Sequence, residues 1–347
     1  MREVRPPIGI IGAGAFGIVM ANLAAENQSV LLYTRSEDMA VVANRERRIR
    51  DYDLHECVTV TADAERLCRE CDLVMPIVPS TAFRKTIRSF GAYLTPRHFV
   101  IHGTKGFDVP IERGGDWRSR KLERAQVRTM SQVIREESAV IRIGCLSGPN
   151  LSSEIAEGQP TATVVASNFD EVVAAGLEAL STDRFQVFGS RELLGAEMAG
   201  ALKNGIAVGS GVLAGRGLGK NIQAILLTRG LVEMVELGKV MGASSRAFLG
   251  SAGIGDLIAT ATSEKSRNFS LGYRIGRGEK LDEIMEGSTV LTEGVRTLRV
   301  AYQLARHYRI HLPIFTTLHH VVVDGYSIDR AMHYLMTYPY DVDVDFV

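Results

Sequence analysis

The sequence lacks an excess of either charge, because 40 basic and 40 acidic residues among its 347 give a formal net charge of zero at pH 7. Proteins that bind nucleic acid or membrane surfaces commonly present a strong basic field, so this balance argues against both kinds of partner. No uninterrupted apolar run reaches the roughly 20 residues that a membrane-spanning helix needs. No signal peptide is visible. We therefore expect a cytoplasmic protein without a membrane span.

Cysteine is also scarce, with four residues in the chain. Cys68 and Cys71 form a C-x-x-C pair, but neither a second pair nor histidines at zinc-ligand spacing accompany it. Cys71 opens an apolar run typical of a strand, so buried free thiols are the favoured interpretation. The sequence predicts no metal site.

What the sequence does contain, close to its start, is a strand, a G-x-G-x-x-G motif and a helix in direct succession. Apolar residues 8–11 precede Gly12, Gly14 and Gly17, and an Ala-rich stretch follows. In dinucleotide sites the first glycine makes the tight turn, the second admits the pyrophosphate, and the third allows close helix–strand packing. The helix N-terminus then favours an anion. The motif predicts a bound dinucleotide, with a ligand-free glycine-rich turn as the alternative.

The next predicted strand, residues 29–33, ends without the usual acidic residue. That acid normally holds the ribose hydroxyls of NAD, whereas this chain has Arg35, with Glu37 and Asp38 close by. A guanidinium can bind the 2′-phosphate of NADP, which a carboxylate would repel. The cofactor is therefore predicted to be NADP or NAD, and Arg35 favours NADP(H).

Strands and helices alternate up to about residue 190, as in a doubly wound α/β sheet. Predicted strands include 72–78, 99–102, 141–146, 161–167 and 185–188. Beyond residue 190 the pattern is almost entirely helical, with predicted helices at 192–215, 222–242, 292–309, 313–324 and 328–336. We accordingly predict a dinucleotide-binding domain over 1–190 and a helical domain over 191–347. The basic stretch 112–137, which holds the single tryptophan, is predicted to be a solvated helix, with a flexible lid or a subunit contact as the alternative.

Lys203 occupies a helix face that carries no other charge. Its neighbours three and four positions away are Ala199, Gly200, Ile206 and Ala207. A lysine in such surroundings faces protein or a cleft, where burial lowers its pKa and lets it exchange a proton near neutral pH. The alternative is a lysine that extends past small residues to water.

Three further residues stand in contexts that favour ligand contact. Lys105 follows a strand within Gly-Thr-Lys-Gly, at the sheet edge where open α/β folds bind ligands. Asp256 closes a glycine-rich loop, where helix N-capping is the simplest role for it. Arg267, between Ser266 and Asn268, suits a phosphate or carboxylate.

Together these motifs resemble the NAD(P)-dependent sn-glycerol-3-phosphate dehydrogenases of the bacterial type. The blocks that carry the resemblance run in order along nearly the whole chain: Gly12–Gly17, Gly103–Gly106, Leu146–Pro149, Ala201–Asn204, Thr228–Gly230, Gly253–Asp256, Ser266–Asn268 and Glu293–Arg296. The resemblance implies a Rossmann domain followed by a helical domain, with the active site in the cleft between them. It also implies reversible reduction of dihydroxyacetone phosphate to sn-glycerol 3-phosphate for phospholipid synthesis. Whether two chains pair as a homodimer stays open.

The resemblance further implies a role for each matching residue. It makes Lys203 the proton donor and acceptor, and Asp256 would orient this lysine. Substrate contacts are implied for Lys105, Gly148, Asn150, Asn204, Asp256, Ser266, Arg267 and Asn268. Dinucleotide contacts are implied for Gly12, Gly14, Ala15, Phe16, Gly17, Arg35, Lys105, Ser152, Arg267, Leu291 and Glu293.

The chain departs from this family's pattern at a few positions. The family usually has Ser or Thr at Asn150, Ala at Ser152, Lys at Ser153 and Trp at Phe16. An amide still donates hydrogen bonds, so we expect activity to survive. Two alternatives remain: a related two-domain reductase of another oxo compound, such as a ketopantoate-like acid, or a non-catalytic dinucleotide-binding regulator.

Overall fold

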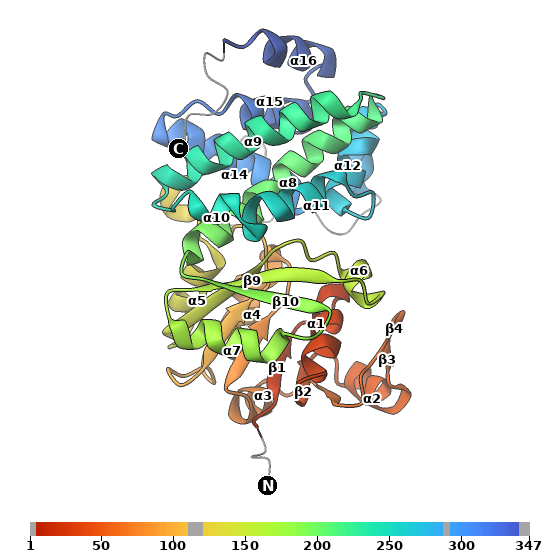
Figure 1. The fold of residues 1–347 in the computed structure, drawn as a ribbon, viewed down its shortest axis with the longest axis vertical. Coiled ribbons are helices and arrows are strands. Elements are labelled where there is room, and N and C mark those ends of the chain that lie inside the picture. The colour runs from red at the N-terminus through yellow and green to blue at the C-terminus, as the bar shows by residue number, and fades with distance from the viewer. Residues whose placement is uncertain (1–4, 110–120, 287–291, 340–347) are drawn as a thin grey trace. The chain divides into compact units, whose positions relative to one another are not determined.

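The computed structural model describes residues 5–109, 121–286 and 292–339, and the chain divides into two compact units (Figure 1). Unit 1 comprises residues 1–104 and 130–193, and unit 2 comprises residues 105–129 and 194–347. The segment 105–129 therefore leaves the first unit, contributes to the second, and returns. As domains, the ranges 1–190 and 191–347 stay a prediction.

Unit 1 is built on an eight-stranded sheet in the order β10-β9-β8-β7-β6-β1-β2-β5. The strands are β1 (Ile8–Ile11), β2 (Val30–Tyr33), β5 (Val58–Thr61), β6 (Leu73–Pro76), β7 (Phe99–His102), β8 (Arg142–Ser147), β9 (Thr161–Ser167) and β10 (Phe185–Ser190). All pairs in this sheet are parallel except β8 with β9, which run antiparallel. A short hairpin of β3 (Arg48–Ile49) and β4 (Tyr52–Asp53) stands apart from it.

Helices cover both faces of this sheet. They are α1 (Ala15–Ala25), α2 (Glu37–Glu46), α3 (Ala64–Glu70), α4 (Ser80–Phe90), α5 (Met130–Glu137), α6 (Ser152–Ala156) and α7 (Asp170–Leu180). Buried residues of α1, α2 and α7 share one apolar core with the sheet, and those of α3, α4 and α5 share another. Helices on both faces of a mainly parallel sheet make a doubly wound Rossmann-type fold, so the predicted fold class is confirmed for this unit.

Unit 2 is helical, as predicted for the second half of the chain. Its elements are the 3₁₀ turn η1 (Arg124–Gln126), α8 (Leu193–Gly215), α9 (Lys220–Val240), α10 (Arg246–Leu249), the π-helical turn η2 (Ser251–Gly255), α11 (Asp256–Thr262), α12 (Arg267–Gly276), α13 (Leu281–Glu286), α14 (Glu293–Tyr308), α15 (Pro313–Val322) and α16 (Ile328–Thr337). Glycines let α8 and α12 pack at backbone distance, because a Cβ on Gly211 would lie 2.0 Å from the carbonyl oxygen of Phe269. This contact fixes the start of α12 beside α8.

The predicted helix over 112–137 is only partly present. Residues 110–120 lie outside the described residues, as does Trp117. Of the remainder, Arg124–Gln126 form a 3₁₀ turn and Met130–Glu137 form α5, so the described part is not one continuous helix. Val127 is buried in the core of unit 2, whereas Met130 and Ile134 are buried against the sheet of unit 1. These three apolar residues, although spaced as on one helix face, therefore belong to two different cores.

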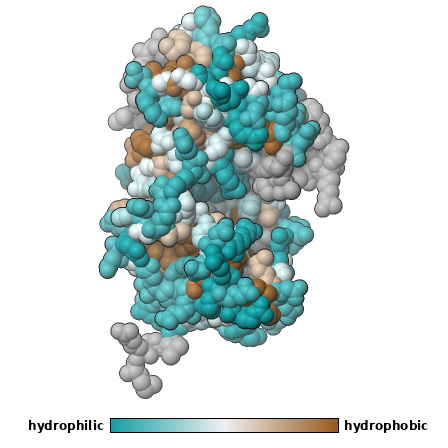
Figure 2. All heavy atoms as spheres, turned by 90° about the vertical axis from the view of Figure 1, so that its right-hand side faces the viewer, coloured by the Kyte–Doolittle hydropathy of each residue, from teal (hydrophilic) through white to brown (hydrophobic). Residues whose placement is uncertain are grey.

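On the face drawn in Figure 2, hydrophilic residues dominate and apolar residues form small separate patches. Within the described ranges, no helix combines the length and the apolar character needed to cross a membrane.

Candidate active site

The glycine-rich loop between β1 and α1 has the shape that each of its glycines predicts. Gly12 has a φ of +124°, and a Cβ there would lie 2.4 Å from the carbonyl oxygen of Ile77. A Cβ on Gly17 would lie 1.9 Å from the carbonyl oxygen of Gly12, so only glycine lets α1 start this close to the strand. A Cβ on Gly14, in contrast, would have no atom of the described residues within 4 Å. Gly14 therefore leaves open space in front of the helix.

The start of α1 is suited to an anion. Gly14 is its N-cap, and because glycine has no side chain it does not cap the first-turn N–H groups itself. The N–H groups of Ala15, Phe16 and Gly17 in the first turn lack carbonyl partners within the helix, and the helix dipole favours negative charge there. This open cradle fits the pyrophosphate of a dinucleotide.

Arg35 is placed where a dinucleotide ribose is bound in folds of this type. It is exposed and lies between the end of β2 and the start of α2, whose N-cap is Ser36. Glu37 and Asp38 occupy the first turn of α2 and are also exposed. A cation thus lies just after the strand end, and the two acids follow it by two and three residues.

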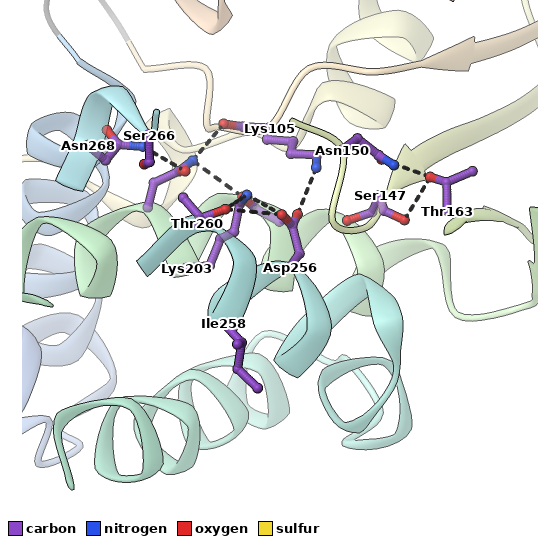
Figure 3. Close-up of polar contacts among 12 residues, drawn as sticks. Lys105, Ser147, Asn150, Thr163, Lys203, Asp256, Ile258, Thr260, Ser266 and Asn268 are labelled. Atoms are coloured by element: carbon purple, nitrogen blue, oxygen red, sulfur yellow. Dashed lines mark hydrogen bonds and ion pairs between the residues drawn. The ribbon is translucent and has the colours of Figure 1, made fainter. Parts of the chain in front are cut away.

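In unit 2, α8 and α11 bring Lys203 and Asp256 together (Figure 3). The Lys203 ammonium donates hydrogen bonds to the Asp256 carboxylate and to the Thr260 hydroxyl. Asp256 and Thr260 lie one turn apart on α11, and the Thr260 hydroxyl also donates to the carboxylate over 3.2 Å. Lys203 is 5% exposed and Asp256 is 1% exposed, so Lys203 does not extend to water.

A second lysine completes this cluster. The Lys105 ammonium donates to the other carboxylate oxygen of Asp256 over 2.7 Å, so one acid faces two cations. The pKa of Lys203 is lowered to about 8 because burial, together with the nearby Lys105 charge, outweighs the opposing effect of Asp256. Lys203 therefore changes protonation state close to neutral pH, which is the property required of a general acid and base.

Asp256 does not have the capping role that the sequence first suggests. Gly255 is the N-cap of α11, and Asp256 is the first residue inside the helix. Its carboxylate is occupied by Lys105 and Lys203 instead of by the backbone of its own helix. The π-helical turn that precedes α11 sets this orientation, and such turns are frequent at functional sites.

The side-chain amides of Asn204 and Asn268 extend the hydrogen-bond network beside this cluster. Asn204 donates to the carbonyl oxygens of Lys105 and Gly200, over 3.2 and 3.3 Å. Asn268 donates to the side-chain oxygen of Asn204 over 2.9 Å, and its own oxygen accepts from the Gly294 N–H over 2.9 Å. These bonds hold the start of α12 and the start of α14 next to the lysine cluster.

Ser266 and Arg267 lie at the start of α12. The Ser266 hydroxyl oxygen caps the helix by accepting from the Phe269 N–H over 3.3 Å, and its own proton remains available to an acceptor. Arg267 is exposed and forms no ion pair with any described residue. Glu293 is the first residue of α14, and Leu291 lies outside the described residues.

The remaining predicted substrate and dinucleotide contacts lie in unit 1, after β8. The Thr163 hydroxyl on β9 donates to the side-chain oxygen of Asn150 over 2.9 Å, and the Asn150 amide donates to the carbonyl oxygen of Ala162 over 3.3 Å. The Asn150 side chain therefore ties its loop to β9. Gly148 in the same loop has a φ of +151°, and Ser152 starts the short helix α6.

Two contacts in this site were missed by sequence reasoning. Thr260 bonds to the proposed proton donor, and its position four residues after Asp256 on one helix was an available signal. The Gly294 N–H contact with Asn268 left no local signal, because the two residues come from different helices.

The two units thus offer an anion cradle with an adjacent arginine, and a buried lysine whose pKa is lowered towards neutrality. The cradle can hold a dinucleotide phosphate, and the lysine can stabilise and protonate an oxygen that gains negative charge. Such a combination is suited to reducing a carbonyl group.

Comparison with known proteins agrees with this chemistry. A model of the NAD-dependent glycerol-3-phosphate dehydrogenase N-terminus matches residues 7–173, and a model of the C-terminus of the same enzymes matches residues 192–333. The chain is 36% identical over 346 residues to the glycerol-3-phosphate dehydrogenase [NAD(P)+] of Pseudomonas aeruginosa, covering 98% of this chain and 97% of that protein.

Two further proteins are similar over almost their whole length. The glycerol-3-phosphate dehydrogenase [NAD(P)+] of Teredinibacter turnerae is 35% identical over 343 residues, which is 97% of this chain and 96% of that protein. The crystal structure of glycerol-3-phosphate dehydrogenase from Coxiella burnetii has a TM-score of 0.83 and 28% identity, covering 96% of this chain and 99% of that one.

Proposed function

Since the chain belongs to the family of NAD-dependent glycerol-3-phosphate dehydrogenases, we propose that Lys203 is the residue that exchanges a proton with the substrate. The chain is an NAD(P)-dependent oxidoreductase. It reversibly reduces dihydroxyacetone phosphate to sn-glycerol 3-phosphate, the precursor of phospholipid synthesis. The cytoplasmic location and the pairing of two chains stay predictions.

The observation that carries the proposed role is the burial of Lys203 between Asp256 and Thr260 with its pKa lowered to about 8. When NAD(P)H is bound, it supplies the hydride that reduces the ketone carbon. The Lys203 ammonium stabilises the charge that develops on the ketone oxygen and delivers a proton to it. Asp256 holds Lys203 in place, and Lys105 adds a second cation on the same carboxylate.

Binding of the substrate phosphate is proposed for the start of α12. Arg267 is exposed there with no ion-pair partner among the described residues, and the Ser266 hydroxyl proton is available as a donor. The amides of Asn204 and Asn268 lie in the same hydrogen-bonded line. Binding energy from a group remote from the reacting carbon positions the ketone for attack.

The dinucleotide is proposed to lie on the cradle of unit 1, with its pyrophosphate at Gly14 and the start of α1. Ala15 and Phe16 would contact it through this first turn, and Gly12 and Gly17 would shape the turn. We propose the remaining dinucleotide contacts, at Lys105, Ser152, Arg267, Leu291 and Glu293, on the family resemblance alone.

Replacement of Lys203 tests the proposed proton transfer. We expect Lys203→Ala to lower kcat/KM for dihydroxyacetone phosphate by about 10²–10⁴-fold, because general acid catalysis contributes that much. NADPH binding, followed by fluorescence titration, should be unchanged. Lys220→Ala, at an exposed lysine at the start of α9, is the matched control and should keep full activity. Near-normal turnover by Lys203→Ala would remove this lysine from the mechanism.

Replacement of Arg35 tests the proposed preference for NADP(H). We expect Arg35→Asp to raise the KM for NADPH at least about tenfold and to change the KM for NADH little, because the carboxylate would repel the 2′-phosphate. Initial rates with both cofactors give the ratio. Arg45→Asp, at an exposed arginine in the last turn of α2, controls for a general change of surface charge. Equal changes for both cofactors would refute a 2′-phosphate contact.

The family assignment leaves the two other functions considered for this sequence without support from the comparisons. Dihydroxyacetone phosphate and a non-phosphorylated 2-oxo acid should be compared side by side as substrates. We expect turnover of the phosphorylated ketone only, because a phosphate carries more charge and more acceptor oxygens than a carboxylate and so binds more strongly to Arg267 and its neighbouring donors. A preference for the oxo acid would overturn the proposed substrate site.

A further inference from the structure

We propose that His319, His320 and Asp324 form a binding site for a divalent transition metal ion at the end of α15. The three residues offer two imidazole nitrogens and one carboxylate oxygen, and these atoms all lie within 4.8 Å of one another. None of the three belongs to the proposed dehydrogenase site. No metal site was predicted from the sequence, although His320 and Asp324 stand four residues apart, a spacing that places them on one helix face.

The distances within this cluster suit a shared ion. One carboxylate oxygen of Asp324 lies 2.7 Å from His320 Nδ1 and 3.5 Å from His319 Nδ1. Ligand atoms about 2.0–2.2 Å from a tetrahedral zinc ion lie roughly 3.3 Å from one another. The two distances lie on either side of this value and the third is at most 4.8 Å, so small side-chain rotations would place the three atoms on one face of a coordination sphere. Water would hold its remaining positions. The His320 and Asp324 side chains are 29% and 35% exposed, so an ion can reach them from solvent.

The ligands are held in place before any ion binds. The His319 ring stacks on Tyr302 of α14, with ring centroids 4.2 Å apart, and the His320 ring stacks on Tyr326 at 4.9 Å. Gly325 turns the chain with a φ of +71°, and the Tyr326 N–H then donates to the carbonyl oxygen of His320 over 3.0 Å. Ligands fixed by packing lose little conformational freedom when they bind.

The ring nitrogens of His319 are buried and open to coordination. This residue is 3% exposed, and among the described residues neither ring nitrogen has a hydrogen-bond partner, although Nδ1 lies 3.5 Å from an Asp324 oxygen. A buried polar atom without a partner is costly, and a metal ion at Nδ1 would remove this cost for that atom.

The ligand types indicate which metals the cluster would select. Asp324 supplies the one carboxylate of the set, and the other two ligands are imidazoles. Mg²⁺ and Ca²⁺ need several oxygen ligands, so this set does not suit them. Zinc, nickel and copper ions form strong bonds to imidazole and tolerate a single carboxylate.

Titration calorimetry on the full-length enzyme tests this site. The protein is treated with a chelator, dialysed, and titrated with ZnCl₂ and separately with MgCl₂. We expect one zinc ion to bind per chain, with a higher melting temperature, and no response to magnesium. His320→Gln and Asp324→Asn should each weaken zinc binding at least about 100-fold, since loss of even an outer-shell partner commonly costs 10–100-fold. Cobalt bound at the same site should give visible absorption bands that both variants lose.

Two control variants separate this site from other zinc ligands on the surface. His333→Gln removes an exposed histidine of α16. Cys57→Ser removes an exposed thiol from a residue whose backbone N–H donates to the His55 ring. Both should bind zinc as the unmodified enzyme does. All four variants should reduce dihydroxyacetone phosphate at the normal rate, which shows that they are folded. The absence of one-to-one zinc binding, or binding that survives His320→Gln and Asp324→Asn, would overturn the proposal and leave a simple histidine–aspartate ion pair.

Discussion

A buried lysine with a pKa of about 8 makes the pH dependence of the two reaction directions opposite. Reduction of the ketone needs the Lys203 ammonium as proton donor, so its rate should fall as pH rises through about 8. Oxidation of glycerol 3-phosphate needs the free amine as acceptor, so its rate should rise over the same interval. Profiles of kcat/KM in both directions between pH 6.5 and 9.5, in steps of roughly half a unit, measure this.

The carboxylate of Asp256 sets the position of these profiles. Its charge raises the pKa of Lys203 against the effect of burial, so Asp256→Asn should move both profiles to lower pH. Thr260→Val keeps the carboxylate and removes only a hydroxyl partner of Lys203, so its profiles should move much less. Profiles that stay in place in Asp256→Asn would mean that another group titrates.

At the scale of single elements, the G-x-G-x-x-G loop before α1 is proposed to use one glycine for binding the dinucleotide and another for packing the helix. Gly14→Ala places a methyl group in open space at an ordinary φ of −82°, so the fold should keep its melting temperature. The same methyl group enters the space proposed for the pyrophosphate, and we expect the Kd for NADPH to rise at least about tenfold. Thermal melting and fluorescence titration on the same sample measure the two effects.

Gly17→Ala is the matched control in the same loop. Its Cβ would lie 1.9 Å from the carbonyl oxygen of Gly12, so α1 must move away from the strand. We expect this variant to melt at a clearly lower temperature or to fail to fold, because overpacking against backbone costs about 1–3 kcal/mol or more. If Gly14→Ala destabilises the protein as much as Gly17→Ala does, the loop has no separate binding position.

The regular elements were predicted where local pattern decides them. Helix 192–215 was found as Leu193–Gly215, and the strand at residues 161–167 was found with the same bounds. Strand orientation was not predictable: β8 and β9 pair antiparallel, whereas all other neighbouring strands of the sheet pair in parallel. The short strand Val58–Thr61, whose four residues alternate Val and Thr, was missed because only its pairing with β2 shows that it is a strand.

The candidate site shows the same division between local and tertiary information. The uncharged surroundings of Lys203 can be read from its own helix, so burial was one of the two outcomes that the sequence left open. Its contact with Thr260 and the double pairing of Asp256 depend on how α8, α11 and the segment after β7 pack together. The sequence therefore indicated which residues matter chemically, and the fold was needed to show how they act on one another.

At the scale of the whole chain, segment 105–129 interrupts the simple order of a first unit followed by a second. It follows β7 in sequence, yet it packs into the helical unit. Lys105 pairs there with Asp256, and Arg124 donates to the Tyr308 hydroxyl over 2.8 Å. Its buried side chains in that core are Phe107, Val109, Leu122 and Val127.

This arrangement predicts that residues 194–347 alone will not fold cooperatively. Burying each of those four apolar side chains stabilises by about 1.5–3 kcal/mol, and their sum is comparable with the 5–15 kcal/mol stability of a whole domain. We expect the isolated fragment to melt without a sharp transition and to bind a hydrophobic dye. Joining residues 105–129 to its start through a flexible linker should restore a cooperative melt followed by circular dichroism. If both fragments melt alike, the segment packs on the helical unit without stabilising it.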